Sequence, residues 1–384
     1  MKGHVRKRGK GWAFVVDVPA GPEGKRRQRW RSGFTTRREA ERALAETIGQ
    51  VHRGEYVERS RLTLGAFLSD EWLPAIRASV RPSTRSSYSM IVRTHIAQRI
   101  GGVPLQALQP SHLNAMYAEL LAGGRRDGKP LSTRSVRLVH ATIRKALGDA
   151  LRWGRVARKV ATLADAPSAG SEQAARRAAM RTWSVAELRA FLATVAHDRL
   201  AAAWHLAATT GMRRGELAGL QWRDVDLEAG RIAVRRAIVS VDYAITASET
   251  KSGRVRVVEL DLGTVAVLRA HRRAQAEERL ALGPAYQDRG VVFCREDGEP
   301  VHPEQWTRMF RSHAKAAGLP AIRLRDLRHT HASILMAGGV HPKVVQERLG
   351  HHSSAFTMDT YAHVMPAMQA EAAAAFAALV DGAQ

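Results

Sequence analysis

The sequence has a single cysteine, no long apolar run and few acidic residues for its size. Cys294 stands alone among 384 residues, which excludes a disulfide framework and indicates a reducing compartment. No apolar segment approaches the roughly 18 residues that a membrane span requires. The basic N-terminus lacks the apolar core and cleavage site of a signal peptide. We therefore expect a cytoplasmic protein with no membrane segment.

Acidic residues are outnumbered by basic ones, 36 Asp and Glu against 60 Lys and Arg, which gives a net charge of +24. Such an excess indicates a polyanionic partner, either nucleic acid or an anionic membrane surface. The hydrophobic content of 45% is ordinary for globular proteins, and the length suits two or three domains. These features together favour a nucleic-acid-binding protein.

Residues 1–58 are predicted to form a small basic domain. Residues 12–18 and 28–34 alternate as strands do, and Thr36 with Glu39 forms a capping box that begins a helix. A small sheet backed by one helix could lie in a DNA groove, although a solvated basic face would have the same composition. The basic residues near the second strand are Arg26, Arg27, Arg29 and Arg31.

Residues 62–160 are predicted to be helical throughout, with helices that begin at Thr63, Ser83, Ser111 and Ser132. Basic residues recur along them, as in a bundle that grips a duplex through its phosphates. Residues 161–181 are rich in Ala, Ser and Arg without apolar periodicity, and we expect a linker there.

Residues 182–384 are predicted to form a mixed α/β domain, so the fold class is mainly α with small β elements (α+β). The sequence predicts a capping box at Ser184 and Glu187 and helices over 200–209, 263–281, 303–317 and 325–337. Residues 231–239 and 254–260 alternate like two paired strands.

The stretch from Ile322 to Val364 carries the clearest chemical pattern. Arg325 and Arg328 share one face at the start of a helix, where like charges repel and the helix dipole disfavours cations. An anion bound there would relieve this repulsion. Pro342 and Gly350 mark the start and end of a further short helix, directly before His351 and some ten residues before Tyr361.

A second basic position lies in TGMRRGEL, where Gly211 can end a helix and Glu216 can hold the side chain of Arg213. Lys251 lies in the TKSG connection between the two predicted strands of this domain. A free phenol is ionised in only about one molecule in a thousand at pH 7, so a tyrosine nucleophile needs nearby cations. Arginines can also stabilise the charge that an attacked phosphodiester gains in the transition state. Arg213 and Arg328 are therefore predicted to hold the phosphate.

Five motifs follow one another in the order seen in tyrosine recombinases, namely TGMRRGEL, TKS, LRHTHAS, LGHHS and DTYAHV. In these motifs the chain resembles the phage-type integrases of that family. The resemblance implies an N-terminal arm-type DNA-binding domain, a helical core-binding domain and a catalytic domain. It implies a DNA integrase of a phage or mobile element that cleaves one strand at a time through a 3′-phosphotyrosyl link, without metal, nucleotide or other cofactor. It also implies double-stranded DNA attachment sites, a homotetramer on DNA and DNA-bending accessory proteins as partners. By position, the catalytic residues are Arg213, Lys251, Arg325, Arg328, His351 and Tyr361.

One position departs from the family pattern, which usually has histidine three residues before the second arginine. Here that position is Arg325. A guanidinium can donate to a phosphate but cannot give up its proton at neutral pH. Arg325 is therefore predicted to act only through its charge.

Two other interpretations remain open from the residues. Asp224 and Asp226 could belong to a metal-dependent transposase or nuclease, although a role in a turn or strand edge is favoured. The change at Arg325 could mark a non-catalytic DNA-binding regulator on a recombinase scaffold. The remaining histidines of these motifs are predicted to be structural, and the spacing of the first two argues against a metal site: His329, His331, His352 and His363.

Overall fold

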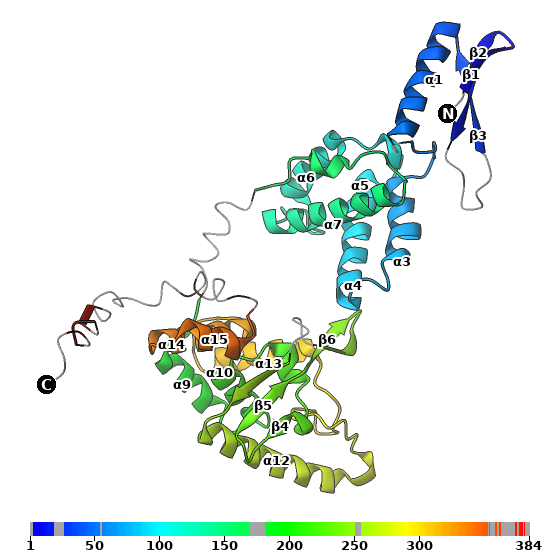
Figure 1. The fold of residues 1–384 in the computed structure, drawn as a ribbon. Helices are drawn as coiled ribbons and strands as arrows, with labels where there is room; N and C mark the ends of the chain where they lie inside the picture. The colour runs from blue at the N-terminus through cyan, green and yellow to red at the C-terminus, as the bar shows by residue number, and fades with distance from the viewer. Residues whose placement is uncertain are drawn as a thin grey trace. The chain divides into compact units, whose positions relative to one another are not determined.

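The computed structural model describes residues 3–18, 27–53, 56–168, 181–249 and 255–351. It also describes the single positions 353, 358 and 361 and helical positions between 373 and 380. The chain divides into two compact units, Met1–Gly170 and Ser171–Gln384 (Figure 1). No helix in the described ranges has the length and apolar character to cross a membrane.

The first unit begins with an antiparallel sheet in the order β1-β2-β3, against which α1 packs. Phe14 and Val16 of β2 meet Leu44 of α1 in its small core. The capping box of Thr36 and Glu39 is confirmed, and so are both predicted strands. The first strand was not predicted, because its basic residues hide the alternation. The elements are β1 Gly3–Arg8, β2 Gly11–Val18, β3 Arg27–Phe34 and α1 Arg37–His52.

Helices make up the rest of the first unit, as the sequence predicts. Thr63 and Ser132 cap helices as expected. The predicted caps Ser83 and Ser111 are wrong, because each helix already begins at the preceding proline, whose fixed φ suits the first helical position. The elements are α2 Leu64–Ala66, η1 Phe67–Trp72, α3 Leu73–Ala75, α4 Pro82–Ile91, η2 Val92–Ile96, α5 Ala97–Ile100, η3 Leu105–Ala107, α6 Pro110–Gly123, α7 Thr133–Arg152 and η4 Val160–Thr162.

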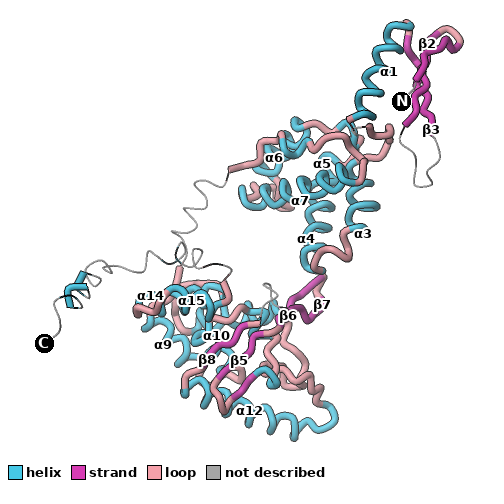
Figure 2. The backbone as a smooth tube through the Cα atoms, viewed as in Figure 1, coloured by secondary structure: helices cyan, strands magenta, loops and turns pink. Residues whose placement is uncertain are grey.

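The second unit is mostly helical, and its strands form two small sheets among the described residues (Figure 2). The capping box of Ser184 and Glu187 at α9 is confirmed. The helices are α9 Val185–Thr194, α10 Ala201–Thr210, α11 Arg214–Ala218, η5 Trp222–Asp224, α12 Leu262–Leu282, η6 Gly283–Ala285, α13 Pro303–Ala316, α14 Leu324–Ala337 and α15 Pro342–Leu349. The strands are β4 Val225–Asp226, β5 Arg231–Val234, β6 Arg236–Val241, β7 Ala244–Glu249 and β8 Arg256–Glu259.

The predicted strand over 231–239 is two strands in the structure. β5 pairs with β8 as expected, whereas β6 pairs with β7 in a hairpin that was not predicted. Its turn residues Asp242 and Tyr243 both have positive φ, as a type I′ turn requires. The hairpin was missed because Asp-Tyr is a weaker turn signal than Asn-Gly or Asp-Gly.

Buried aromatic side chains hold the second unit together. Trp204 of α10 packs edge-on against Trp306 of α13, at 5.4 Å between ring centroids. Phe310 of α13 contacts Phe191 of α9 at 5.3 Å. These contacts help to bury α10 in the core of the unit. Its C-terminal end is therefore held rigidly and can position the side chains of a site.

Candidate active site

The end of α10 and the start of α11 position Arg213. Gly211 adopts the left-handed conformation, with φ of 63°, and ends α10. Arg213 follows as the N-cap of α11, and its backbone N–H donates to Glu216 Oε2 at 2.9 Å. Its guanidinium donates to Glu216 Oε1 at 2.7 Å. The predicted Arg213–Glu216 pair is confirmed.

Glu216 also receives Arg256 from β8, a contact that the sequence did not predict. Arg256 donates to both carboxylate oxygens, at 3.0 and 2.6 Å. The Glu216 side chain is only 2% exposed. Burial opposes its ionisation, but hydrogen bonding and charge from Arg256, assisted by Arg213, lower the pKa of Glu216 to about 2. This carboxylate is therefore ionised and shared between two arginines.

Arg328 lies in α14 and is largely buried. Its guanidinium donates to the carbonyl oxygen of Gly211 at 2.8 Å and to that of Leu349. These carbonyls lie at the C-terminal ends of α10 and α15, where the helix dipole favours a cation. Burial, and next the charge of Arg213, lower the pKa of Arg328. A guanidinium nevertheless stays protonated at neutral pH.

Both arginines converge on the end of α15. Arg213 Nη2 donates to the carbonyl oxygen of Gly350 at 3.1 Å, next to the Leu349 carbonyl that Arg328 binds. Gly350 is left-handed, with φ of 64°, and leads the chain to His351. Since each guanidinium has several N–H groups, these carbonyl contacts orient the arginines and leave donors for an anion.

The ring of His351 lies parallel to that of Tyr361, at 6.5 Å between centroids and 9° between planes. Burial, and next the charges of Arg328 and Arg213, lower the pKa of His351 to about 3. The imidazole is therefore neutral at pH 7, so one ring nitrogen carries a proton.

Tyr361 is fully buried and packs against Ala332, Val345 and Leu349. Its hydroxyl is hydrogen-bonded to Nδ1 of His329 at 2.6 Å. Burial raises the pKa of Tyr361 to about 12, and the charge of Arg328 opposes this rise. The phenol is therefore protonated in this state.

Four of the six predicted site residues lie together, namely Arg213, Arg328, His351 and Tyr361. The Arg325 side chain is 54% exposed, and its Nε lies 3.5 Å from Asp326 Oδ1. Lys251 lies outside the described residues, as do His352 and His363.

The contact between His329 and Tyr361 was not predicted. His329 was predicted to be structural, because neither its helical position nor its spacing from His331 points to a partner 32 residues away. The sequence signal for this contact is the position of His329, directly after Arg328. His331 does have a structural role: its Nδ1 is hydrogen-bonded to the Ala208 carbonyl oxygen at 2.9 Å.

The two aspartates of the nuclease hypothesis are engaged with arginines and backbone. Asp224 pairs with Arg235 and Arg236, at 3.3 and 3.2 Å. Asp226 accepts a hydrogen bond from the Ala229 backbone N–H at 2.8 Å. These contacts fit the favoured role at a turn and strand edge. No group of three or more His, Cys, Asp or Glu side chains that could hold a metal occurs within the ranges described.

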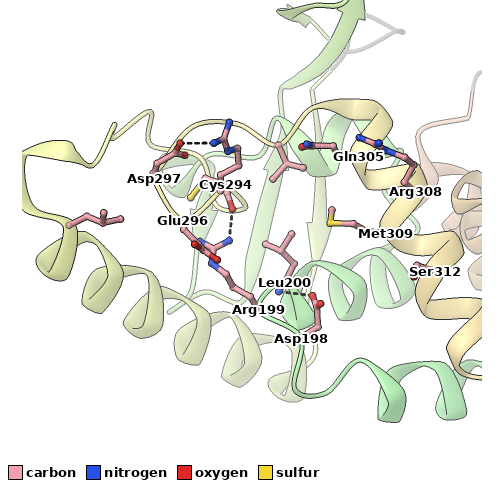
Figure 3. Close-up of a pocket in the computed structure, with 13 residues that line it drawn as sticks. Asp198, Arg199, Leu200, Cys294, Glu296, Asp297, Gln305, Arg308, Met309 and Ser312 are labelled. Atoms are coloured by element: carbon pink, nitrogen blue, oxygen red, sulfur yellow. Dashed lines mark hydrogen bonds and ion pairs between the residues drawn. The ribbon is translucent and has the colours of Figure 1, made fainter.

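A pocket in the same unit lies among residues that the sequence motifs do not include (Figure 3). Arg199 donates there to the Cys294 carbonyl oxygen at 2.7 Å and binds Glu278. The Cys294 thiol is free and buried. None of the five predicted site residues that the structure describes lines this pocket.

Three family models match the chain. The Arm DNA-binding domain matches residues 4–51, the N-terminal SAM-like domain of phage integrases matches residues 63–121, and the phage integrase family matches residues 180–368.

Curated relatives extend over most of the chain. A "Tyrosine recombinase XerC-like" protein of Caldanaerobacter subterraneus subsp. tengcongensis is 26% identical over 351 residues, which cover 88% of each chain. The ICEBs1 integrase of Bacillus subtilis is 26% identical and aligns over 94% of this chain and 95% of its own.

Solved structures share the fold. The Tn1549 transposon integrase in complex with transposon right end DNA is similar with a TM-score of 0.64 and 19% identity, over 83% of this chain and 99% of its own. A lambda integrase tetramer bound to a Holliday junction has a TM-score of 0.55 and 17% identity, over 91% of this chain and 96% of its own. The family predicted from the motifs is confirmed: this chain belongs to the tyrosine recombinases, as a phage-type integrase, and is thus a site-specific DNA recombinase.

Proposed function

We propose that Tyr361 is the nucleophile with which this recombinase cuts one DNA strand, forming a 3′-phosphotyrosyl link and a free 5′-hydroxyl. The observation that carries the proposal is the convergence of Arg213 and Arg328 on the carbonyls at the end of α15, beside His351 and Tyr361. Cations held in this way need not reorganise when the attacked phosphate gains charge.

Each of the other residues has a role that follows from its chemistry. Arg213 and Arg328 bind the non-bridging oxygens, and arginines in related phosphoryl transfer contribute about 10³–10⁵ in rate, roughly 4–7 kcal/mol. The neutral imidazole of His351 donates one N–H to the same phosphate. Lys251 protonates the departing 5′ oxygen, and Arg325 adds positive charge. The reaction needs neither metal nor nucleotide.

The DNA partner and the assembly are proposed from the relatives. The solved structures that share the fold include a lambda integrase dimer bound to a core site and a lambda integrase tetramer bound to a Holliday junction. We expect this chain to act as a homotetramer on double-stranded attachment sites in the cytoplasm, with accessory proteins that bend the DNA. Residues 1–58 would bind arm-type sites, residues 62–160 the core site, and residues 182–384, after the linker 161–181, would carry the chemistry.

The test is adduct trapping on a nicked suicide substrate built from DNA that flanks the coding region. Loss of a short 5′-ended fragment prevents religation, so wild type accumulates a covalent protein–DNA adduct. Tyr361→Phe should bind the same DNA and form none. Tyr243→Phe is the matched control, because this ring is 82% exposed on the β6–β7 hairpin.

The same experiment decides between a recombinase and a regulator. If wild type binds its site specifically but forms no adduct on the nicked substrate, the protein is a DNA-binding regulator. An adduct that persists in Tyr361→Phe would move the nucleophile to another residue.

A further inference from the structure

The imidazole of His329 is hydrogen-bonded to Tyr361, the proposed nucleophile. Its Nδ1 lies 2.6 Å from the Tyr361 hydroxyl, and the ring centroids are 5.8 Å apart. His329 directly follows Arg328 in α14. The same turn of helix therefore positions a proposed phosphate-binding arginine and the hydrogen-bonding partner of the phenol.

The direction of this hydrogen bond follows from the two acidities. Burial, as the main cause, lowers the pKa of His329 below its ordinary value of 6.5, so the ring is neutral at pH 7. Burial keeps the phenol protonated. The hydroxyl therefore donates and Nδ1 accepts, which leaves the ring proton on Nε2.

Charged side chains at the start of α14 act on this imidazole. Asp326 raises the pKa of His329, whereas Arg328, Arg325 and the N-cap residue Arg323 lower it. Across from α14, the groups that face it are Tyr361 and His351, and His351 is itself neutral at pH 7. Among the described residues, Asp326 is the carboxylate that acts on His329, and the ring, neutral at pH 7, can accept a proton.

This contact matters because the position three residues before Arg328 is occupied by Arg325. A histidine there could exchange a proton with the reacting groups, but Arg325 cannot. His351 lies parallel to the phenol at 6.5 Å between ring centroids. His329, by contrast, is hydrogen-bonded to the hydroxyl itself.

We propose that His329 is a catalytic residue, the general base that accepts the phenol proton of Tyr361. The inference rests on the proposed function. As the proton passes from Tyr361 Oη to His329 Nδ1, Oη bonds to phosphorus and the bond from phosphorus to the 5′ oxygen breaks. The departing 5′ oxygen takes its proton from the general acid, proposed to be Lys251. Rejoining runs the same transfers backwards, so that His329 returns the proton to the phenol.

His329→Asn tests the proposal, because an asparagine oxygen lies near the position of Nδ1 and accepts a hydrogen bond without accepting a proton. Single-turnover adduct formation on the suicide substrate should slow by about 10²–10⁴-fold, the usual contribution of a general base. His205→Gln is the matched control. Its ring is also hydrogen-bonded, to the Thr264 hydroxyl at 3.1 Å, and burial likewise lowers its pKa.

The pH profile separates a base from a structural contact. Wild type should react at a constant rate across neutral pH and slow only below the lowered pKa of His329. His329→Asn should instead rise about tenfold per pH unit, because only the ionised phenol then attacks. A flat profile at the wild-type rate in His329→Asn would overturn the proposal. Should this variant not fold, wild type decides alone: a tenfold rise per unit through neutral pH means that no base takes the proton.

Sulfur in place of the 5′ bridging oxygen separates a base from an acid. A thiolate leaves without protonation, because a thiol is far more acidic than an alcohol. The slowing of His329→Asn should persist on this substrate, whereas full recovery would make His329 the acid and overturn the proposal. If wild type forms no adduct on the oxygen substrate, or Tyr361→Phe still does, the proposed function is what fails. An adduct that requires Tyr361 but is formed equally fast by His329→Asn refutes the role of His329 alone.

Discussion

Glu216 and Arg256 form a buried ion pair whose two hydrogen bonds measure 3.0 and 2.6 Å, with exposed side-chain fractions of 2% and 10%. The pair joins α11 to β8. Because Glu216 also binds Arg213, the orientation of this proposed phosphate-binding arginine depends on Arg256, which lies 40 residues beyond Glu216 in the chain.

Replacing Glu216 with glutamine should therefore destabilise the protein strongly. Loss of one partner from a buried pair leaves an uncompensated charge and typically costs about 3–5 kcal/mol. Urea unfolding of Glu216→Gln measures this loss. Glu228→Gln is the control, because Glu228 is 90% exposed in its pair with Arg269 and should change the free energy of unfolding by less than about 1 kcal/mol. Equal effects of the two substitutions would contradict the structural role of Glu216.

The same carboxylate predicts a dependence of stability on pH. The pKa of Glu216 is lowered to about 2 in the folded protein, from an ordinary value of 4.5. A carboxyl group whose pKa is lowered on folding binds its proton more readily in the unfolded chain. The stabilisation that ionised Glu216 gives the folded protein is therefore present above pH 4.5 and is lost as the pH falls towards 2. The free energy of unfolding should fall less steeply across this interval in Glu216→Gln than in wild type. Parallel curves would exclude the linkage.

Gly350 combines a left-handed backbone with a close neighbour. A Cβ at this position would lie 2.9 Å from Cδ of Arg256. Gly318 has nearly the same φ, 67° against 64°, but nothing within 4 Å of such a Cβ. Gly318→Ala should thus show backbone strain alone, about 1 kcal/mol, in thermal or urea unfolding. Gly350→Ala should destabilise more than this and slow adduct formation, because it displaces the arginine that holds Glu216. Equal stability and activity of the two variants would contradict this account.

Local signals made much of the fold predictable. The capping boxes at Thr36 and Ser184 involve residues three positions apart, and Gly211 and Gly350 end helices through their own backbone conformation. Such features are encoded within one turn of chain. The β6–β7 hairpin was missed because its turn lacks glycine, and the starts of α4 and α6 were misplaced because the proline precedes the serine by one residue.

The site was only partly predictable for a related reason. Its residue types could be selected from the motifs, but its contacts are made across the fold. Arg328 reaches the Gly211 carbonyl 117 residues away, and neither periodicity nor spacing encodes that approach. The contact of His329 with Tyr361 and that of Arg256 with Glu216 arise in the same way. The motifs indicate which segments carry the chemistry, whereas the packing of the fold determines which side chains meet.

Chelation should leave cleavage unchanged. Asp224 is bound by two arginines and Asp226 by a backbone N–H, so both carboxylates already have partners. The proposed chemistry uses fixed cations of the protein. Adduct formation with and without EDTA, at constant ionic strength because DNA binding is salt-dependent, is the measurement. Loss of the adduct in EDTA and its return with a divalent cation would favour a metal-dependent reaction.

Arg325 provides a test of purely electrostatic action. Its side chain is 54% exposed, so solvent and salt screen its charge, and Arg325→Ala should slow adduct formation by about tenfold or less at low salt. Arg325→Lys keeps the charge and should stay within about twofold of wild type. The difference between the two variants should shrink as salt is added. Because the charge of Arg325 lowers the pKa of His329, the acid limb of the pH profile should move to higher pH in Arg325→Ala. Cleavage by Arg325→Ala at the wild-type rate in low salt would mean that this charge has no part in the reaction.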